Sequence, residues 1–426
     1  MFLLLSRLLL GARRQPPIQP LLDDQVNRYK AANSNVAGLS DRQKIEVQTA
    51  SAQKKGTVSV VVPTLNEAHR VTPCLMGLSA QGADVGEIVV VDSRSTDGTQ
   101  AVVDQWAQQD SRIRLMTDEP LPDGWVGRPW ALQTGFLQSD AASEWVLGID
   151  ADTQPQPGLV ASLLHEAIAQ GYDMVSLSPR FILRSPGEWW LQPALLMTLI
   201  YRYDSAGVQK PGTERVMANG QCFLARRSVL SALGGYRCAA SSFCDDVTLV
   251  REAARRGFCV GFLDGAQVIS VRMYEGLQET WLGWGRSLDL KDATTPGQLW
   301  SDLWLLVATQ GLPVLLIGPL AWAWWEEARS PMLLAAIALN SVLLLIRFGM
   351  QAAVAGSYQW PEAGSYQWPE AGSGLRRHRL GAWASASCFW LAPFADPFAV
   401  LRIVLSAFQQ SITWRGQVYQ KGPSSL

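Results

Sequence analysis

Residues 87–99 read EIVVVDSRSTDGT, and this stretch decides the expected fold. Its first part, Glu87–Val91, is a β-branched run of the kind found in strands that are buried on both faces of a parallel sheet. The run ends at Asp92, and a polar loop containing Asp97 precedes a helical pattern at Ala101–Gln109. Because strand, polar loop and helix in this order are typical of βαβ units, the stretch predicts an α/β fold with a parallel sheet.

Two more apolar runs, Val58–Val62 and Glu144–Ile149, end in polar clusters in the same way. The side chains that follow the two runs include Pro63, Asn66, Glu67, Asp150 and Asp152. In open α/β sheets, ligands bind outside the carboxyl ends of the strands. We therefore expect residues 57–290 to form one domain with a mostly parallel sheet and a ligand site along that edge.

The polar clusters carry groups that suit a nucleotide and its phosphates. The clusters that follow Val58–Val62 and Glu87–Val91 offer hydrogen bonds to hydroxyls, a ribose or a base edge. Asp150 and Asp152 can share Mg²⁺ or Mn²⁺ with a diphosphate, because hard cations prefer carboxylate and phosphate oxygens. Each cluster taken alone is also common in ordinary turns and helix caps, so only their combination is informative.

A further pair of acids lies in Ser242–Leu249, which reads SFCDDVTL. A carboxylate at this position can act as a general base that takes the proton from an acceptor alcohol. Asp245 and Asp246 are the two candidates, and each raises the pKa of the other through like-charge coupling. Alternatively, the two acids only complement the dipole of the helix that follows.

Taken in chain order, these four elements resemble those of the family 2 glycosyltransferases. That family has the GT-A fold, whose sheet is Rossmann-like. The resemblance covers about residues 57–290 and implies inverting transfer of a hexosyl or pentosyl group from a nucleotide-diphosphate sugar. It implies a Mg²⁺ or Mn²⁺ ion on Asp150 and Asp152, and Asp246 as the base, with Asp245 where the family has Glu. The residues that it assigns to the nucleotide-sugar are Pro63, Asn66, Glu67, Asp92, Ser95, Asp97 and Asp150.

Finer motifs resemble a subgroup associated with carotenoids and hopanoids. Residues 123–135, DGWVGRPWALQTG, are similar to its Gly-Trp-x-Gly-Lys-x-Trp-Ala segment, with Arg128 in place of Lys. The other similar segments are 272–276 (RMYEG), 283–287 (GWGRS) and 413–419 (TWRGQVY). The resemblance implies that Arg128 and Arg286 bind the diphosphate, although Arg128 on the surface against Trp125 is the alternative. We expect Trp125, Gly220 and Gln221 to line the site of a lipid-soluble alcohol acceptor, best matched by a hydroxylated carotenoid.

Residues 302–355 contain two long apolar stretches. Leu303–Trp325 has no charged residue and Met332–Ala355 has only Arg347, so both are long enough to cross a bilayer. A basic run at 376–379 is typical of a cytoplasmic loop. We therefore expect a multi-pass membrane protein in contact with membrane lipid, with its catalytic domain in the cytoplasm. A buried helix pair in a soluble fold is the alternative.

The remaining segments allow more than one interpretation. Residues 1–56 are basic and suggest an amphipathic interfacial anchor or a frayed tail. The basic loop 356–379 includes most of a tandem octapeptide, AGSYQWPE, that begins at Ala355. Residues 380–408 are apolar but interrupted by two prolines and two charges, which favours a kinked span or a re-entrant hairpin. That choice decides on which side of the membrane the tail 409–426 lies.

Several function classes are disfavoured by composition and motifs. The 36 basic and 37 acidic side chains argue against nucleic-acid binding through bulk charge. The sequence contains neither the complete glycine fingerprint of a dinucleotide-binding dehydrogenase nor a P-loop. Two alternatives to a carotenoid enzyme stay open. One is transfer to a hopanoid, glycolipid or polyprenyl phosphate, and the other is a non-catalytic membrane scaffold with a decayed transferase domain.

Overall fold

The structure is a computed structural model that divides into two compact units. We call residues 15–180 and 209–271 the sheet unit, and residues 1–14, 181–208 and 272–426 the helical unit. Residues 181–208 lie inside the expected 57–290 domain but group with the helical unit. The residues described are 15–21, 56–203, 206–207, 215–284, 288, 290, 293–326, 330–360, 387–409, 411–414 and 417–420.

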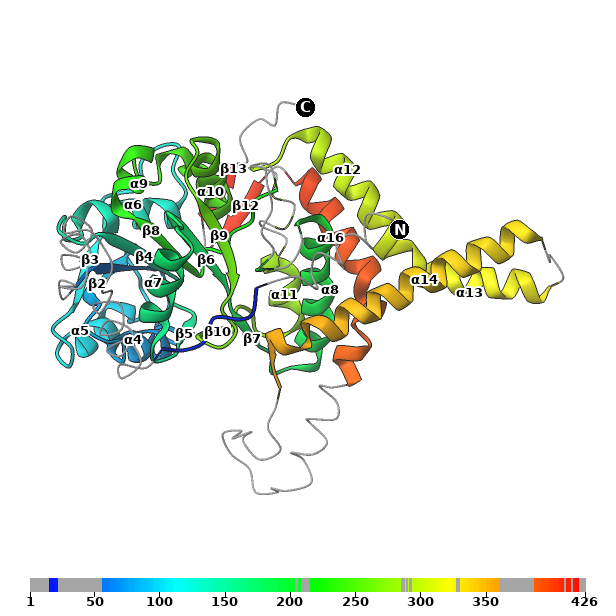
Figure 1. The fold of residues 1–426 in the computed structure, drawn as a ribbon, viewed down its shortest axis with the longest axis horizontal. Coiled ribbons are helices and arrows are strands. Elements are labelled where there is room, and N and C mark those ends of the chain that lie inside the picture. Colours follow the sequence, from blue (N-terminus) through cyan, green and yellow to red (C-terminus); the bar gives the residue numbers. More distant parts are fainter. Residues whose placement is uncertain are drawn as a thin grey trace, which may run out of the picture. The chain divides into compact units, whose positions relative to one another are not determined.

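The sheet unit is built on a seven-stranded sheet in the order β3-β2-β1-β4-β8-β6-β9 (Figure 1). Its strands are β1 (Val58–Thr64), β2 (Val85–Asp92), β3 (Ile113–Thr117), β4 (Trp145–Ile149), β6 (Met174–Ser178), β8 (Cys222–Arg226) and β9 (Val260–Asp264). β8 runs antiparallel to both of its neighbours, and the other pairs are parallel. The expected mostly parallel, Rossmann-like sheet is confirmed. A short antiparallel pair, β5 (Thr153–Pro155) and β10 (Ile269–Val271), completes this unit.

Helices cover both faces of the sheet (Figure 1). One face packs against α4 (Val71–Ser79), α5 (Thr99–Ala107) and α7 (Leu159–Ala169), and the other against α6 (Gly127–Gln138), α9 (Arg227–Leu233) and α10 (Asp245–Arg255). Within β1, Val60 and Val62 enter the first core and Val61 the second. This follows from the two-residue period of a strand, and it explains why the run is apolar at nearly every position.

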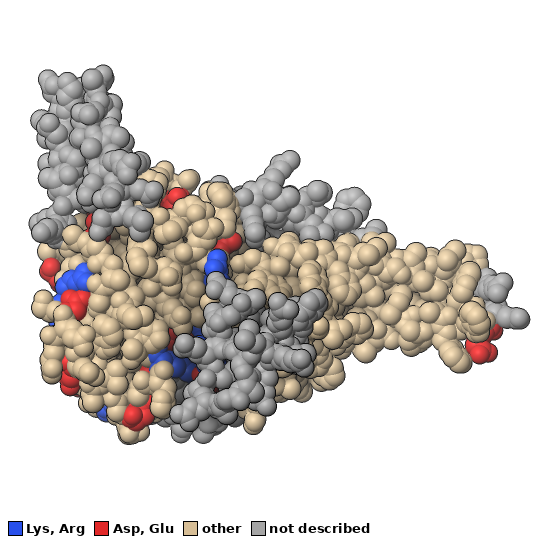
Figure 2. Space-filling model, turned by 90° about the horizontal axis from the view of Figure 1, so that it is seen from below, with Lys and Arg blue, Asp and Glu red and all other residues tan. Residues whose placement is uncertain are grey.

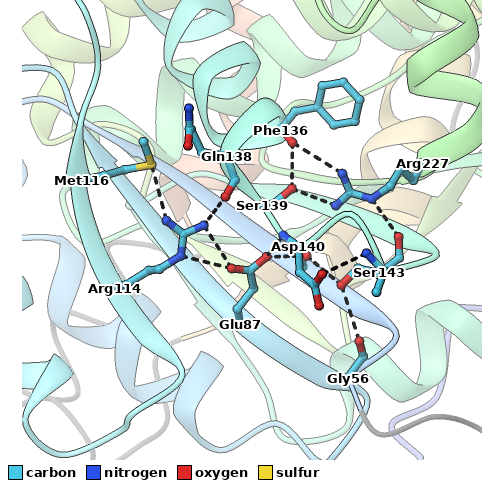
Figure 3. Close-up of polar contacts among 12 residues, drawn as sticks. Gly56, Glu87, Arg114, Met116, Phe136, Gln138, Ser139, Asp140, Ser143 and Arg227 are labelled. Atoms are coloured by element: carbon cyan, nitrogen blue, oxygen red, sulfur yellow. Dashed lines mark hydrogen bonds and ion pairs between the residues drawn. The ribbon is translucent and has the colours of Figure 1, made fainter.

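A polar network ties the amino ends of the parallel strands together (Figure 3). Glu87 of β2 accepts hydrogen bonds from Arg114 Nε at 3.1 Å and from the backbone N–H of Asp140 at 2.5 Å. Arg227 donates to the backbone oxygen of Ser143 at 2.7 Å. Since this network lies at the sheet edge opposite to the carboxyl ends of β1, β2 and β4, it stabilises the sheet away from the candidate site.

The helical unit consists mainly of helices. Its elements are α8 (Pro186–Tyr203), α11 (Gly276–Trp284), α12 (Pro296–Leu306), the π-helical turn η2 (Val307–Gly311), α13 (Leu312–Trp325), α14 (Pro331–Val354), the 3₁₀ turns η3 (Ala355–Ser357) and η4 (Ala392–Ala395), α16 (Asp396–Phe408), and the strands β11 (Tyr358–Gln359), β12 (Ser411–Trp414) and β13 (Gln417–Gln420). β11 pairs in parallel with β7 (Arg180–Ile182), a strand at the boundary of the two units, and β12 pairs antiparallel with β13. An η1 turn (Arg237–Ala239) and α9 belong to the sheet unit.

Two continuous helices, Pro296–Trp325 with 30 residues and Pro331–Ser357 with 27, are long and apolar enough to cross a membrane. Side chains of Thr295 and Ser330 accept hydrogen bonds from the first turns of these helices and so define where they begin. α13 and α14 form a hairpin that projects from the rest of the helical unit (Figure 1). The face of this hairpin seen in Figure 2 shows no charged residue until its tip, where acidic side chains lie. The two apolar helices expected within 302–355 are therefore present.

Several expectations fall outside the described residues. They concern residues 1–14 and 22–55 of the amino-terminal segment, Arg286, residues 361–379 of the basic, repeat-containing loop, residues 380–386 of the apolar segment 380–408, and residues 410, 415–416 and 421–426 of the tail.

Candidate functional site

The antiparallel pairing of β4 with β8 brings two sequence motifs together. Ile149 at the end of β4 faces Cys222 at the start of β8, so Asp150 lies beside Gln221. The backbone N–H of Asp150 donates to the carbonyl oxygen of Gln221 at 3.2 Å. The segment before β8 thus meets the Asp150-Ala151-Asp152 segment at the carboxyl edge of the sheet.

Arg128 joins the functional groups of this edge. It lies in the first turn of α6, and its side chain is only 16% exposed. Its Nε donates to Asp150 Oδ1 at 2.9 Å, and its Nη2 donates to the carbonyl oxygen of Gly220 at 2.6 Å. Its Nη1 donates to Asp245 Oδ2. One guanidinium therefore links three segments that sequence analysis had assigned to diphosphate, acceptor and base.

Gly220 is needed for this arrangement. A Cβ at this position would lie 2.6 Å from Arg128 Nη2 and 2.9 Å from its Cζ, which is closer than real Cβ atoms approach. The backbone of Gly220 also hydrogen-bonds the Asp246 carboxylate. A larger residue would push the guanidinium away from its partners, so Gly220 positions Arg128.

Asp245 and Asp246 begin α10, and both carboxylates have raised pKa values. Burial raises the pKa of Asp245 to about 7, the charge of Arg128 opposes this shift, and the negative charge of Asp246 adds to it. Burial also raises the pKa of Asp246, against the effect of Arg128 and of two backbone hydrogen bonds. A carboxylate with a pKa near the working pH is suited to accept a proton from an alcohol.

The donor set at Asp150 and Asp152 fits a divalent cation that is shared with a phosphate ligand. Mg²⁺ is commonly bound by one or two carboxylates together with substrate phosphates and water. Within the described ranges, no three His, Cys, Asp or Glu side chains are grouped so that they could hold a metal ion. The protein would therefore supply two carboxylates, and the phosphates would supply further oxygen ligands.

The loops after β1 and β2 are interlocked by hydrogen bonds. The backbone N–H of Asn66 donates to Ser95 Oγ at 2.8 Å, and Asn66 Oδ1 accepts from the N–H of Thr96 at 2.9 Å. The N–H of Ala68 donates to Asp97 Oδ2 at 3.0 Å. Asn66 adopts a positive φ of 56°, which Asn tolerates better than most residues. These contacts give the two loops one defined conformation.

Asp92 is fully buried at the end of β2 and holds its own loop together. It accepts hydrogen bonds from the N–H of Ser95 at 2.9 Å, Ser95 Oγ at 2.5 Å, Gln100 Nε2 at 2.7 Å and Thr64 Oγ1 at 3.2 Å. An ionised carboxylate has about four lone-pair sites, so these donors occupy its capacity. A nucleotide that binds Asp92 directly must replace one of them.

Sequence analysis missed Asp118, which follows β3 at the same edge. Asp118 is 8% exposed, and its Oδ2 accepts a hydrogen bond from Ser93 Oγ at 2.8 Å. Its Oδ1 is buried and has no hydrogen-bond partner among the described residues. Burial raises the pKa of this carboxyl group despite the hydrogen bond from Ser93. The signal was weak, because Asp118 directly follows its strand as Asp150 does, but β3 reads IRLMT and is not a continuous apolar run.

The expected site residues fall into two groups along one edge of the sheet. One group consists of Arg128, Asp150, Gly220, Gln221, Asp245 and Asp246, and the other of Asn66, Glu67, Asp92, Ser95 and Asp97, with Pro63 in the adjoining end of β1. Buried Cys74 adjoins the first group, since its Sγ donates to the backbone oxygen of Asp150 at 3.6 Å. Burial raises the pKa of its thiol to about 12, with smaller contributions from the negative charges of Asp152 and Glu67. Trp125 packs edge-on against Trp130, with ring centroids 5.2 Å apart.

Residues 59–234 match the family model described as Glycosyl transferase family 2. This part of the chain is therefore similar to family 2 glycosyltransferase domains. This match covers β1 to α9 and thus includes Arg128, Asp150 and Gly220. Asp245 and Asp246 lie beyond its end.

Curated relatives of this domain are glycosyltransferases by name. A 4,4'-diaponeurosporenoate glycosyltransferase from Staphylococcus haemolyticus is 25% identical over 56% of this chain and 63% of its own length. The probable glycosyltransferase YdaM from Bacillus subtilis is 23% identical over 54% of this chain and 53% of its own length. A polyprenol monophosphomannose synthase from Mycolicibacterium smegmatis is 25% identical over 47% of this chain and 73% of its own length. The chain thus spans about half to two thirds of the length of the first two relatives.

Solved structures also show similarity to the chain. A mannosyltransferase from Pyrobaculum calidifontis, in complex with GDP-Man and Mn²⁺, is 20% identical with a TM-score of 0.44, over 81% of this chain and 88% of that chain. A glucosyl-3-phosphoglycerate synthase from Mycobacterium tuberculosis is 20% identical with a TM-score of 0.39, over 62% of this chain and 84% of that chain.

Proposed function

We propose that the protein is a membrane-associated, inverting glycosyltransferase that moves a sugar from a nucleotide-diphosphate sugar to a hydroxyl of a lipophilic acceptor. The observation that carries this proposal is the cluster in which Arg128 joins Asp150, Gly220 and Asp245. In this cluster one guanidinium contacts Asp150, which we assign to the diphosphate side, and Asp245, one of the two candidate bases. The domain match supports the reaction class.

The transfer is a single displacement in this proposal. Asp246, with Asp245 beside it, accepts the proton of the acceptor hydroxyl while that oxygen forms a bond to the anomeric carbon. The bond between the anomeric carbon and the diphosphate oxygen breaks, and its electron pair leaves with the nucleoside diphosphate. The sugar passes through an oxocarbenium-like state, as in inverting glycoside chemistry, so attack from the opposite face inverts its configuration.

Arg128 and the Asp150–Asp152 pair act on the leaving group. Asp150 and Asp152 would hold Mg²⁺ or Mn²⁺, which supplies positive charge to the departing diphosphate when it is bound. The guanidinium of Arg128 has a planar fork of donors that suits phosphate oxygens as well as the carboxylates that it now contacts. We propose that Pro63, Asn66, Glu67, Ser95 and Asp97 form the nucleotide side, and that Trp125 and Gln221 belong to the acceptor side.

The acceptor that we favour is a hydroxylated carotenoid, specifically the 2'-hydroxyl of a myxol-type carotenoid. Motifs such as Asp123–Gly135 resemble those of a carotenoid-associated subgroup, and the relative from Staphylococcus haemolyticus is named for a carotenoid acid. A hopanoid, glycolipid or polyprenyl phosphate is the alternative acceptor, and a relative named as a polyprenol monophosphomannose synthase supports it.

The two long apolar helices support a membrane location. We propose that Pro296–Trp325 and Pro331–Ser357 cross the bilayer and that the glycosyltransferase domain faces the cytoplasm. The basic residues at 376–379 support this orientation through the positive-inside rule.

Two assays test the proposal. Purified protein in vesicles should hydrolyse or transfer sugar from nucleotide-diphosphate sugars when Mn²⁺ is added, and a protein that binds but never turns over any of them would be a scaffold. Pigment and lipid profiles of a deletion strain should then show loss of one glycosylated carotenoid with accumulation of its aglycone. Loss of a glycosylated hopanoid or polyprenyl lipid instead would replace the carotenoid as acceptor.

A further inference from the structure

α16 buries both of its charged side chains, together with Ala399, Val400 and Ile403, and exposes most of its larger apolar side chains. Asp396 and Arg402, the charged residues of this helix, are buried within the helical unit. In a water-soluble protein the charged face of a helix is normally the outer one. The reversed arrangement indicates that the medium outside α16 is apolar.

The two charged side chains on the inner face of α16 have polar partners. Asp396 Oδ2 accepts a hydrogen bond from Arg347 Nε at 2.7 Å, and its Oδ1 accepts one from Gln310 Nε2 at 3.0 Å. Arg402 Nε donates to the carbonyl oxygen of Trp281 at 2.8 Å. Both charges are therefore neutralised or hydrogen-bonded inside the unit, as expected where no water is available to solvate them.

The outer face is an apolar stripe that extends from just before η4 to the end of α16. Its members are spaced three or four residues apart, so they align on one side of a helix, and each is between 47% and 64% exposed. They are Leu391, Phe394, Phe398, Leu401, Leu405 and Phe408, which we call the outer stripe.

The length of α16 excludes a membrane crossing by this helix. It has 13 residues, which at the rise of an α-helix give about 20 Å, against about 30 Å for the hydrocarbon core. A 3₁₀ turn, η4, with Pro393 near its start, precedes it directly. α16 can therefore lie along a bilayer surface but is too short to span it.

The outer stripe is continuous with the surface of the first candidate span. α16 packs against α12, η2 and α13, which together form that span. The ring of Phe408 lies 5.9 Å from the ring of Trp300 on α12, and Phe398 lies 5.7 Å from Trp190 on α8. Tryptophan is enriched at the membrane–water interface, because its ring is apolar and its N–H is polar.

We propose that α16 is an interfacial helix that lies along one leaflet with the outer stripe in the acyl-chain boundary, and that it is neither a third span nor a re-entrant segment. The proposal rests on the membrane location proposed above for the two long helices. It places both ends of α16, and with them the β12–β13 hairpin, on the same side of the bilayer.

The depth of individual side chains tests this proposal. A fluorescent amino acid is introduced singly at Phe398, Leu401 or Leu405 of the full chain, which is reconstituted in phosphatidylcholine–phosphatidylglycerol vesicles. Bromine atoms at defined acyl-chain positions then report depth by quenching. We expect one shallow depth for all three positions. Probes at Leu334, Leu339 and Leu345 of α14 are the controls and should report depths that change steadily along that helix.

The outcomes separate this proposal from the one on which it rests. Depths that change steadily from 398 to 405 would show a spanning or re-entrant segment. Fluorescence that iodide quenches at all three positions, with the α14 probes still in lipid, would show that α16 faces water. If the α14 probes also face water, the membrane location itself fails.

A charged substitution provides a second measurement with a matched control. The double variant Leu401→Glu/Leu405→Glu should lose lipid quenching of a probe at Phe398 and gain quenching by iodide, because two carboxylates on the stripe oppose burial in lipid. Leu137→Glu changes a leucine on the sheet unit that is even more exposed and should alter neither signal. Unchanged lipid quenching at Phe398 in the double variant would contradict the proposal.

Discussion

The sheet unit and the helical unit differ in the large apolar side chains that they expose. In the sheet unit, apolar clusters fill both sides of the sheet. Its exposed large hydrophobic residues, among those described, are Met76, Leu137 and Ile168, and all the others lie in the helical unit. Both units bury charged residues, such as Asp92 and Arg251 in the sheet unit and Arg347 and Asp396 in the helical unit. The difference in exposed apolar side chains fits the proposal that water surrounds one unit and lipid the other.

Each unit contains a buried arginine that pairs with carboxylates. Arg347 is 1% exposed and pairs with Asp396, so its role is to hold α14 and α16 together. Arg128 is less enclosed, and its partners are the residues proposed for chemistry. Breaking the first pair should change stability, and breaking the second should change catalysis. The four predictions below test this difference, beginning with the largest expected effect.

Asp246→Asn should lower kcat by roughly 10²- to 10⁴-fold, because a general base is removed. The affinity for the nucleoside diphosphate should remain nearly unchanged, since the loops after β1 and β2 are not altered. Steady-state kinetics and calorimetric titration with the diphosphate measure the two effects. Asp245→Asn is the matched variant. If it lowers kcat more than Asp246→Asn does, Asp245 is the general base and Asp246 is not.

Arg347→Met should destabilise the helical unit by about 3–5 kcal/mol, because it leaves the Asp396 carboxylate buried without its charge partner. Thermal or denaturant unfolding in detergent or vesicles measures this loss. The double variant Arg347→Met/Asp396→Leu should regain much of the stability, since no buried charge is left unpaired. Equal stability of wild type and Arg347→Met would mean that the pair does not hold the helices.

Arg128→Met should lower kcat/KM by about a hundredfold, as when one preorganised donor is removed from a transition state. Arg128 lowers the pKa of Asp245 and Asp246, so its removal raises both values. Because the base must be deprotonated, the acid limb of the pH profile should move to higher pH.

Two further variants show whether this shift is specific to Arg128. Arg128→Lys keeps the charge and should shift the limb less. Arg227→Met removes a guanidinium from the opposite sheet edge (Figure 3) and should leave the pH profile in place. If the pH profile of Arg128→Met does not move, Arg128 does not set the pKa values of Asp245 and Asp246.

Asp118→Asn should weaken nucleotide binding by no more than about tenfold, the effect of one hydrogen bond to a charged group. Titration of uridine, guanosine and cytidine diphosphates would show whether the loss depends on the base. Asp123→Asn is the control, since Asp123 is exposed and lies in the same connection between β3 and α6. Identical affinities in the wild type, Asp118→Asn and Asp123→Asn would place Asp118 outside the nucleotide site.

Local sequence patterns predicted the strands and the acids that follow them. Asp92 and Asp150 could be placed because each ends a β-branched run, and chain direction puts such ends at one sheet edge. This reasoning did not find Asp118, because β3 reads IRLMT and is not a β-branched run. It could not show that Asp92 is saturated by Ser95, Gln100 and Thr64, because these donors act through the folded loop.

The sequence by itself determined the parallel α/β core, the acids at its carboxyl edge and the two long apolar helices, since each depends on residues close together in the chain. Only the tertiary structure decided that Arg128 meets Asp245, 117 positions away, and that α16 turns its charges inward. Helical spacing reveals that a helix has two faces, but which face is covered depends on distant segments. Those long-range pairings are settled by packing and by the cost of burying an unpaired charge.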